Sequence, residues 1–301
     1  MRRCSMLGSV GEREGSEDWE WDESLFEGSA AFYEKGRLPY APGIGEALRD
    51  ALKLDGTGRL LDVGCGPGTV TVVFAPYFAD AVGLDPDSGM IDEARRVAER
   101  EQRANTRFIK ARAEDLPLDL APIRVATFAA SFHWMDRPRV AATVRTMVEP
   151  GGAAVQVDAP GYRYDDLKAA SDRGELPHPP PPDSEMDELR RRYLGLDRRA
   201  GRGIRNKHPS GEDKVFQAAG FAPARRVVVM DGRVLVRTID QLVASRFSLS
   251  HTAPPLFGDR IDDFEADLRA LLAAASPSGK FAVRLPDNIL SIWQPLDGRS
   301  S

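Results

Sequence analysis

The sequence predicts a doubly wound α/β fold built on a mainly parallel sheet of seven strands. Between residues 59 and 157, short apolar runs alternate with helical patterns, as in a right-handed succession of strands and crossover helices. A tight glycine turn follows the first of these runs, and an acid stands at the end of each of the first two. At 301 residues with 42% hydrophobic content, the chain is long enough to bury a large core.

The predicted elements of this region come in a regular order. Strands are expected at 59–63, 81–84, 106–111, 123–129 and 153–157, and helices at 69–78, 88–102 and 138–148. Ser88 is the predicted N-cap of the second of these helices. Two short helices, separated by the proline-containing stretch 38–42, should precede the sheet between residues 30 and 54.

The pattern becomes less regular after residue 160. A proline run at 177–182 and an arginine-rich run indicate an insertion, followed by a helix at 212–219, a strand at 225–230 and helices over 238–274. Two β-rich pieces, 280–285 and 289–293, flank Pro286-Asp287-Asn288, which predicts a hairpin at the sheet edge with an antiparallel C-terminal strand. The expected units are a disordered acidic tail (1–24), a cofactor-binding core with an N-terminal helical cap (25–158), a lid insertion (159–210), and the C-terminal part of the core sheet (211–301) with a helical insertion at about 238–275.

Composition restricts the classes of partner. The net charge is −5, and residues 1–24 alone contribute −4 through seven acids and three arginines. The rest of the chain therefore has no basic excess of the kind that attracts nucleic acid. Cys4 and Cys65 are the only cysteines, which favours a reducing, cytoplasmic setting. No stretch approaches the roughly 20 apolar residues of a membrane span. We expect a small-molecule partner. The sequence leaves the oligomeric state open.

The most informative segment runs from Asp62 through Gly64, Gly66 and Gly68, and is followed by Asp85 at the end of the next strand. Its G-x-G-x-G spacing differs from the G-x-G-x-x-G fingerprint of dinucleotide-binding proteins. In an open α/β sheet, ligands bind beyond the carboxyl ends of the strands, where both acids should lie. Asp85 suits the ribose diol of S-adenosylmethionine, Asp62 suits its ammonium group, and the peptide N–H groups of the turn suit its carboxylate. The alternative is that the glycines only make a tight strand-to-helix turn.

The segment Leu60 to Thr69 with Asp85 resembles the first two motifs of class I S-adenosylmethionine-dependent methyltransferases. It is most similar to the small-molecule group related to quinone-biosynthesis and trans-aconitate methyltransferases (methyltransferase type 11). Further matching segments lie at 33–40, 85–90, 113–117 and 131–136. The resemblance covers residues 30 to 158 and is weak beyond them. It implies a Rossmann-like core and S-adenosylmethionine as the cofactor.

The cofactor residues expected from these motifs are Asp62, Gly64, Cys65, Gly66, Gly68, Asp85, Pro86, Met90, Ala113, Glu114 and Ser131. By the resemblance, Met90 would pack on the adenine face, Ala113 and Glu114 would lie at its amino edge, and the backbone around Ser131 would line the methyl end. Arg112 stands where the family usually has an acid, so Glu114 would have to supply the adenine contact. The usual Phe-Asp at the start of the fourth strand is replaced by Ile123-Arg124.

The expected substrate pocket combines residues of the N-terminal helices, of the segment after the fourth strand, and of the late helical region: Tyr33, Arg37, Tyr40, Phe132, His133, Trp134 and His251. His133 is the candidate general base, because imidazole titrates closest to neutral pH. Its alternative role is simple packing against Trp134. No spacing typical of a metal site is present.

We therefore expect a methyltransferase that moves a methyl group from S-adenosylmethionine to an oxygen, nitrogen or carbon of a small molecule by direct displacement. One alternative is an RNA methyltransferase using the seven arginines between Arg190 and Arg205, a run that otherwise forms a solvated lid. A nicotinamide dehydrogenase is disfavoured by the glycine spacing. A third alternative is a cofactor-binding partner protein without catalysis.

Overall fold

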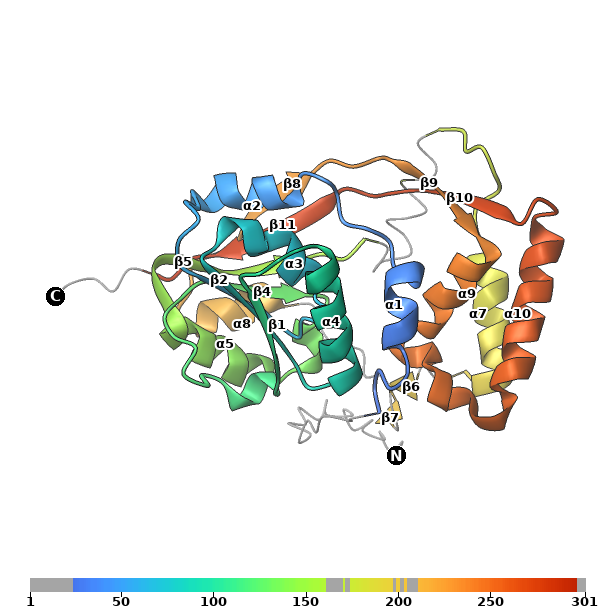
Figure 1. The fold of residues 1–301 in the computed structure, drawn as a ribbon, viewed down its shortest axis with the longest axis horizontal. Coiled ribbons are helices and arrows are strands. Elements are labelled where there is room, and N and C mark those ends of the chain that lie inside the picture. Colours follow the sequence, from blue (N-terminus) through green and yellow to red (C-terminus); the bar gives the residue numbers. More distant parts are fainter. Residues whose placement is uncertain are drawn as a thin grey trace, which may run out of the picture.

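The computed structural model describes residues 24–160, 170, 174–196, 199–200, 203–204 and 211–296. Its largest feature is a seven-stranded sheet with the order β3-β2-β1-β4-β5-β11-β8 (Figure 1). The strands are β1 (Arg59–Val63), β2 (Asp80–Asp85), β3 (Thr106–Lys110), β4 (Ile123–Ala129), β5 (Val148–Val157), β8 (Arg225–Val229) and β11 (Asn288–Trp293).

The first five strands of this sheet are parallel, and β11 is antiparallel to both of its neighbours, β5 and β8. The predicted seven-stranded, mainly parallel sheet with an antiparallel C-terminal strand is thus confirmed. β11 lies one position in from the edge, because β8 adds to its outer side.

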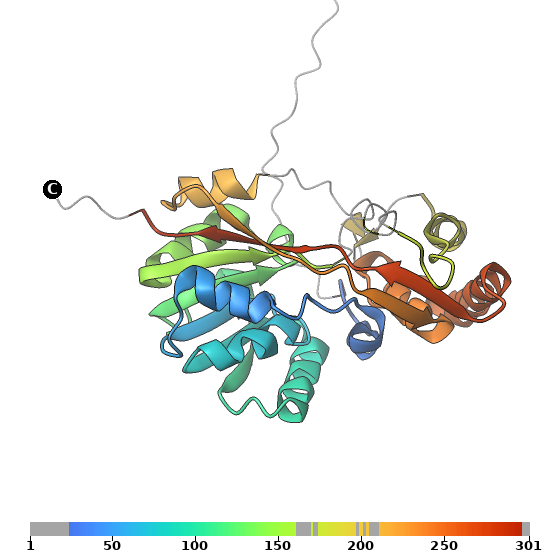
Figure 2. The ribbon, with the colours of Figure 1, turned by 90° about the horizontal axis from the view of Figure 1, so that it is seen from above.

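Helices cover both faces of the sheet. The helices α2 (Ile44–Leu52), α3 (Thr69–Phe74) and α4 (Ser88–Arg100) lie on one face, and α5 (Arg137–Met147) and α8 (Glu212–Ala218) lie on the other (Figure 2). The 3₁₀ turn η1 (Ala75–Tyr77), which contains Pro76, follows α3 directly. No helix among the residues described is long and apolar enough to cross a membrane.

The N-cap of α4 is Asp87, and the assignment of Ser88 to this position was wrong. The Asp87 carboxylate accepts a hydrogen bond from Met90 N at 2.9 Å, while its backbone is extended (φ −83°, ψ 120°). Ser88 is already the first helical residue. A carboxylate at this position also interacts favourably with the positive end of the helix dipole.

A helical unit lies beside the sheet (Figure 1) and consists of α7 (Asp183–Leu194), α9 (Ile239–Phe247), α10 (Ile261–Ala275) and the 3₁₀ turns η4 (Ser250–Thr252) and η5 (Pro254–Arg260), and α1 (Ala30–Gly36) packs on its helix α9. The unit has a core of its own, in which Phe257 stacks on Phe264 with ring centroids 4.1 Å apart. Phe247 is also fully buried there. The very short strands β6 (Arg199–Ala200) and β7 (Gly203–Ile204) pair with each other.

A two-stranded ribbon of β9 (Val234–Thr238) and β10 (Lys280–Arg284) links this unit to the sheet (Figures 1 and 2). The predicted hairpin around Pro286-Asp287-Asn288 was therefore wrong: β10 pairs with β9, and the chain then continues into β11. The reason lies in Asn288, which is buried and bridges two distant segments. Its Oδ1 accepts from Ala41 N at 2.7 Å, and its Nδ2 donates to Asp158 O at 3.1 Å.

Helix α1 packs closely on α9. A Cβ atom on Gly36 would come within 2.5 Å of the Ala244 carbonyl oxygen, so only glycine fits at this crossing. The buried Arg237 of β9 donates from Nη2 to Gly36 O and to Gln241 O, both at 2.8 Å. Helix α1 is therefore fixed to elements about 200 residues later in sequence.

Candidate functional site: a pocket at the carboxyl ends of the strands

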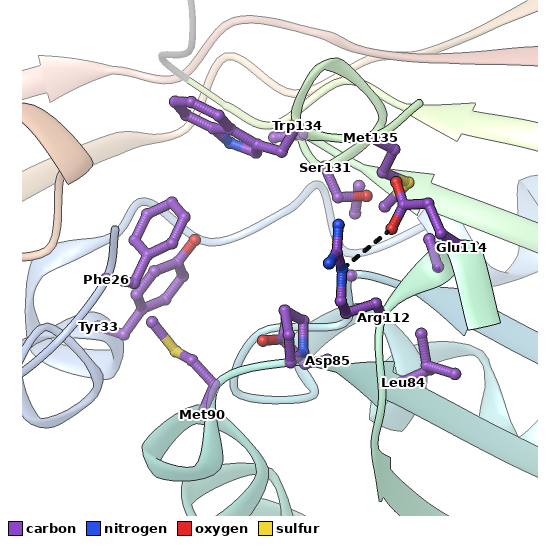
Figure 3. Close-up of a pocket in the computed structure, with 15 residues that line it drawn as sticks. Phe26, Tyr33, Leu84, Asp85, Met90, Arg112, Glu114, Ser131, Trp134 and Met135 are labelled. Atoms are coloured by element: carbon purple, nitrogen blue, oxygen red, sulfur yellow. Dashed lines mark ion pairs between the residues drawn. The ribbon is translucent and has the colours of Figure 1, made fainter. Parts of the chain in front are cut away.

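A cavity lies at the carboxyl ends of β2 and β4, between the sheet and α1. Asp85, Arg112, Glu114 and Ser131 lie on the sheet side, and Phe26, Tyr33 and Met90 face them (Figure 3). Trp134 lies over the space between the two walls. The cavity therefore combines a polar wall with an aromatic one.

The turn between β1 and α3 forms one boundary of this region. Gly64 has a φ of +69°, and a Cβ there would be 2.5 Å from the Ser131 Cβ. Gly66 also has a positive φ of +53°, but a Cβ there would meet no protein atom within 4 Å. Gly68 is needed for packing, because its Cβ would lie 2.9 Å from that of Ala94. Of the three, Gly66 presents its backbone to open space, where a ligand can approach closely.

The carboxylate of Asp85 is fixed at the end of β2. Its Oδ2 accepts from Gly66 N at 2.8 Å, and its Oδ1 accepts from Asp87 N at 2.9 Å. The residue is only 8% exposed but lines the cavity, and this burial raises its pKa to about 6. The acid thus presents a preorganised acceptor to a ligand.

Asp62 lies behind the glycine turn and is fully buried. Thr71 Oγ1 donates to its Oδ2 at 2.6 Å, and Thr127 Oγ1 donates to its Oδ1 at 2.8 Å. Burial raises the pKa of this carboxyl to about 6 as well. Asp62 links β1, α3 and β4, and its carboxylate is not part of the cavity wall.

Cys65 also lies away from the cavity wall, packed with the residues of α4 and β3. Burial raises the pKa of its thiol well above the usual value, and the nearby Asp85 and Asp62 act in the same direction. The thiolate is the reactive form of cysteine. This side chain therefore has a packing role.

The wall formed by Arg112, Ala113 and Glu114 follows β3. Glu114 accepts from Asp136 N at 2.8 Å through Oε1, and its Oε2 lies 3.6 Å from Arg112 Nε (Figure 3). Met90, on the first turn of α4, closes the opposite side with a side chain that is 2% exposed. Pro86 and Ala113 also line the cavity.

The connection after β4 is held in an unusual backbone conformation. Ala130 has a φ of +52°, which an L-residue with a side chain seldom adopts. The next residue, Ser131, donates from Oγ to Val63 O at 2.6 Å, which ties this connection to the end of β1. Both residues line the cavity. Strained residues of this kind occur preferentially at functional sites.

The structure separates the residues expected in the substrate pocket. Tyr33 and Trp134 line the cavity. Phe132 is part of the sheet core instead, stacked on Phe216 with centroids 4.9 Å apart. His133 is half-buried beside Trp134, at a centroid distance of 4.7 Å, and His251 is buried in η4.

Arg37 and Tyr40 lie next to the cavity, on the segment leading from α1 to α2. The Arg37 guanidinium stands 4.5 Å over the ring of Tyr33, and its Nη2 donates to Ser248 O at 2.6 Å. Burial raises the pKa of Tyr40 above its usual range. Arg37 therefore connects Tyr33, a pocket residue on α1, to Ser248 at the end of α9.

The wall also contains residues that had not been predicted as site residues, among them Phe26, Leu84, Arg112 and Met135. The Phe26 ring meets that of Trp134 edge to face, with centroids 6.0 Å apart. Phe26 lies in the turn before α1, where no periodic pattern marks it. Among the residues described, no group of three or more His, Cys, Asp or Glu side chains is placed to hold a metal ion.

Of the described arginines of the basic run, Arg190, Arg191 and Arg192 belong to α7, and Arg199 begins β6. Arg190 is 3% exposed, and its Nε donates to Asp187 at 2.9 Å and its Nη1 to Gly195 O at 3.3 Å. Arg191 pairs with the same acid at 2.8 Å. The predicted tail up to residue 23, and positions 198, 202 and 205 of the run, lie outside the described residues.

Comparison with known proteins agrees with this geometry. Residues 60–152 match the family described as "Methyltransferase domain". An uncharacterized methyltransferase of Mycobacterium bovis is 34% identical over 132 residues, which are 44% of this chain and 51% of the relative. A probable S-adenosylmethionine-dependent methyltransferase of Saccharomyces cerevisiae is 34% identical over 96 residues (31% and 33%). A ubiquinone biosynthesis O-methyltransferase of Acinetobacter baylyi is 32% identical over 96 residues (31% and 40%).

Residues 60–152 are thus similar to a methyltransferase domain, and this region also resembles a probable S-adenosylmethionine-dependent methyltransferase. The match covers the strands β1 to β4 and the beginning of β5, which include the glycine turn, Asp85 and the Arg112–Glu114 wall. The chain spans about half the length of the first curated relatives it matches.

Proposed function

We propose that this protein transfers the methyl group of S-adenosylmethionine to an oxygen, nitrogen or carbon of a small-molecule acceptor. The observation that carries the proposal is the position of the Asp85 carboxylate at the end of β2, where it accepts a hydrogen bond from Gly66 N. Open space lies beside the backbone of Gly66. An acid held by two backbone N–H groups is a rigid acceptor for a ribose diol. The missing Cβ leaves room for the rest of the cofactor.

The remaining cofactor contacts follow from the cavity walls. Met90 would pack on one face of the adenine, with Ala113 at its edge and Pro86 beside the ribose. Ala130 and Ser131 would lie along the methyl end. Asp62 and Cys65 would act from behind the wall by holding the glycine turn. The donor set and the open backbone fit an adenosyl group.

When bound, S-adenosylmethionine would supply a methyl group on a positively charged sulfur: the acceptor atom would bond to the methyl carbon as the carbon–sulfur bond breaks, and S-adenosylhomocysteine would leave. The main task of the protein is then alignment, which can contribute roughly 7–11 kcal/mol to lowering a barrier. Tyr33, Phe26 and Trp134 line the cavity, where their rings would exclude water and orient the ligands. His133 lies on the turn after β4, where an imidazole could take the proton of an acceptor hydroxyl or amine.

Three observations support a small acceptor over RNA. Phe26 and Tyr33, from α1 and the turn before it, line the cavity on the side opposite the strand ends, which favours an enclosed substrate. Arg190 and Arg191 are engaged with Asp187, so these two side chains are already paired within α7. One relative in the matched region is named for ubiquinone biosynthesis, which is small-molecule chemistry.

The test is a calorimetric titration with S-adenosylhomocysteine, run in parallel with NADH. Micromolar binding of the former alone is expected, and binding of NADH alone would overturn the proposal. Acceptors would then be screened by following the formation of S-adenosylhomocysteine. A protein that binds the cofactor but transfers no methyl group to any acceptor would be the non-catalytic partner instead. Salt-sensitive RNA binding that is lost when the arginines of the basic run become glutamine would favour an RNA acceptor.

A further inference from the structure

Arg112 occupies the wall of the cavity on the side where the proposed function puts the adenine. Its backbone N–H donates to the Asp115 carboxylate at 2.9 Å, which fixes the point where the side chain leaves the main chain. The side chain extends between Asp85 and Glu114 (Figure 3). It is 41% exposed, so a ligand in the cavity can reach its guanidinium.

The neighbouring acid, Glu114, is already committed to the protein. Its Oε1 accepts from Asp136 N at 2.8 Å, and its Oε2 faces Arg112 Nε at 3.6 Å. Its carbonyl oxygen accepts from Arg139 Nη2 at 2.9 Å, which holds the whole turn in place. With only 10% of its side chain exposed, this carboxylate is a poor acceptor for a further donor on a ligand.

The chemistry of arginine then decides what the pocket recognises on the base. A guanidinium has five N–H donors and no acceptor. An adenine edge offers ring nitrogens that accept hydrogen bonds and a 6-amino group that donates them. Arg112 can donate to a ring nitrogen, and its plane can pack against the base. It cannot accept from the 6-amino group.

We propose that Arg112 is the residue that recognises the base of the cofactor, through ring nitrogens and stacking, and that the 6-amino group is not recognised. This inference rests on the proposed function and specifies how its cofactor is selected. It has a direct consequence. A base with oxygen at position 6 carries a proton on N1 but keeps N7 as an acceptor and adds O6 as another, so with Arg112 donating to N7 S-inosyl-L-homocysteine should bind as well as S-adenosyl-L-homocysteine.

The experiment compares these two ligands by calorimetry on the full chain. For the unchanged protein we expect dissociation constants within about threefold of each other, because no hydrogen bond to the 6-amino group is lost. In R112Q the glutamine amide can accept from the 6-amino group while it donates to N7, so the preference should shift toward the adenosyl ligand by about tenfold. R96Q is the matched control, since Arg96 is an exposed arginine of α4 that pairs only with Glu93 among the contacts of the described residues. It should leave the ratio unchanged.

The outcomes separate this inference from the function on which it rests. If the unchanged protein binds neither ligand, the proposed function itself fails. If it binds S-adenosylhomocysteine but discriminates against the inosyl ligand by about tenfold or more, the function stands and the role of Arg112 is refuted. If folded R112Q has the same ratio of dissociation constants for the two ligands as the unchanged protein, the role of Arg112 is refuted as well. The comparison in the unchanged protein decides the matter even where R112Q does not fold.

Discussion

Cofactor binding should depend on pH in a window set by Asp85. Burial raises the pKa of this carboxyl to about 6, although the N–H groups of Gly66 and Asp87 act in the opposite direction. The hydroxyl groups of a ribose diol donate hydrogen bonds, so the ionised carboxylate is the form that binds the diol. Affinity should therefore be constant above about pH 7 and should fall as the pH drops through the pKa near 6.

The size of the effect follows from the ionised fraction. With a pKa of about 6, about 99% of Asp85 is ionised at pH 8 and about one-eleventh at pH 5. If only the ionised form binds, the dissociation constant should rise about tenfold between these two values, which corresponds to about 1.4 kcal/mol. The carboxylate of the ligand titrates below this range.

The assay is calorimetric titration with S-adenosylhomocysteine at pH 5, 6, 7 and 8. Asp85→Asn should raise the dissociation constant at pH 8 by about thirtyfold, since a hydrogen bond to a charged group contributes about 2 kcal/mol, and should remove the pH dependence. Asp62 also titrates near pH 6, so Asp62→Asn serves as the control that must retain the dependence. Asp92→Asn on the surface of α4 controls for the loss of a charge. Constant affinity from pH 5 to 8 in the unchanged protein, or a change below twofold in Asp85→Asn, would refute the assignment.

Three further substitutions test other parts of the structure. Gly66→Val should abolish calorimetric binding of S-adenosylhomocysteine, because the new side chain fills the open space, and should lower stability by about 1–2 kcal/mol through its left-handed backbone. An unchanged binding curve would contradict the close approach. His133→Ala should lower turnover about a hundredfold with cofactor affinity intact, whereas equal turnover in steady-state assays would leave His133 only a packing role against Trp134. Gly36→Ala should destabilise the fold by about 1–3 kcal/mol in urea titrations because its Cβ meets Ala244 O, and an unchanged midpoint would argue against the tight crossing.

The sheet and its order of helices were predictable because their signals are local. Apolar runs of strand length alternate with helical patterns in the sequence, and a glycine turn marks the first connection. Asp85 was predictable for a related reason: parallel strands end at the same edge of the sheet, so an acid at the end of a strand must lie there. None of these predictions depends on contacts between segments that are distant in sequence.

The errors come from contacts between distant segments. Pro286-Asp287-Asn288 has the composition of a turn, but Asn288 bridges Ala41 and Asp158. The strand that begins at Asn288, β11, pairs with β5 and β8. Phe132 stands beside two pocket candidates in sequence, yet its ring stacks on Phe216 in the sheet core. No local pattern distinguishes these outcomes from the predicted ones.

The pocket itself explains why the adenosine side was easier to predict than the acceptor side. Asp85, Arg112 and Ser131 come from strand ends of the sheet, whereas Phe26 and Tyr33 come from α1 and the turn before it.

Helix α1 is fixed to the helical unit by the glycine crossing at α9 and by Arg237, whose pKa burial lowers to about 10 while it donates to three carbonyl groups. A single ion pair on the described surface, Glu34 with Arg100 at 2.9 Å, ties α1 to α4, and exposed pairs of this kind contribute little. One wall of the cavity thus depends on packing within the sheet domain, and the other depends on packing within the helical unit. The shape available to an acceptor is set by how these two units meet, which is long-range information that no motif of the first 158 residues contains.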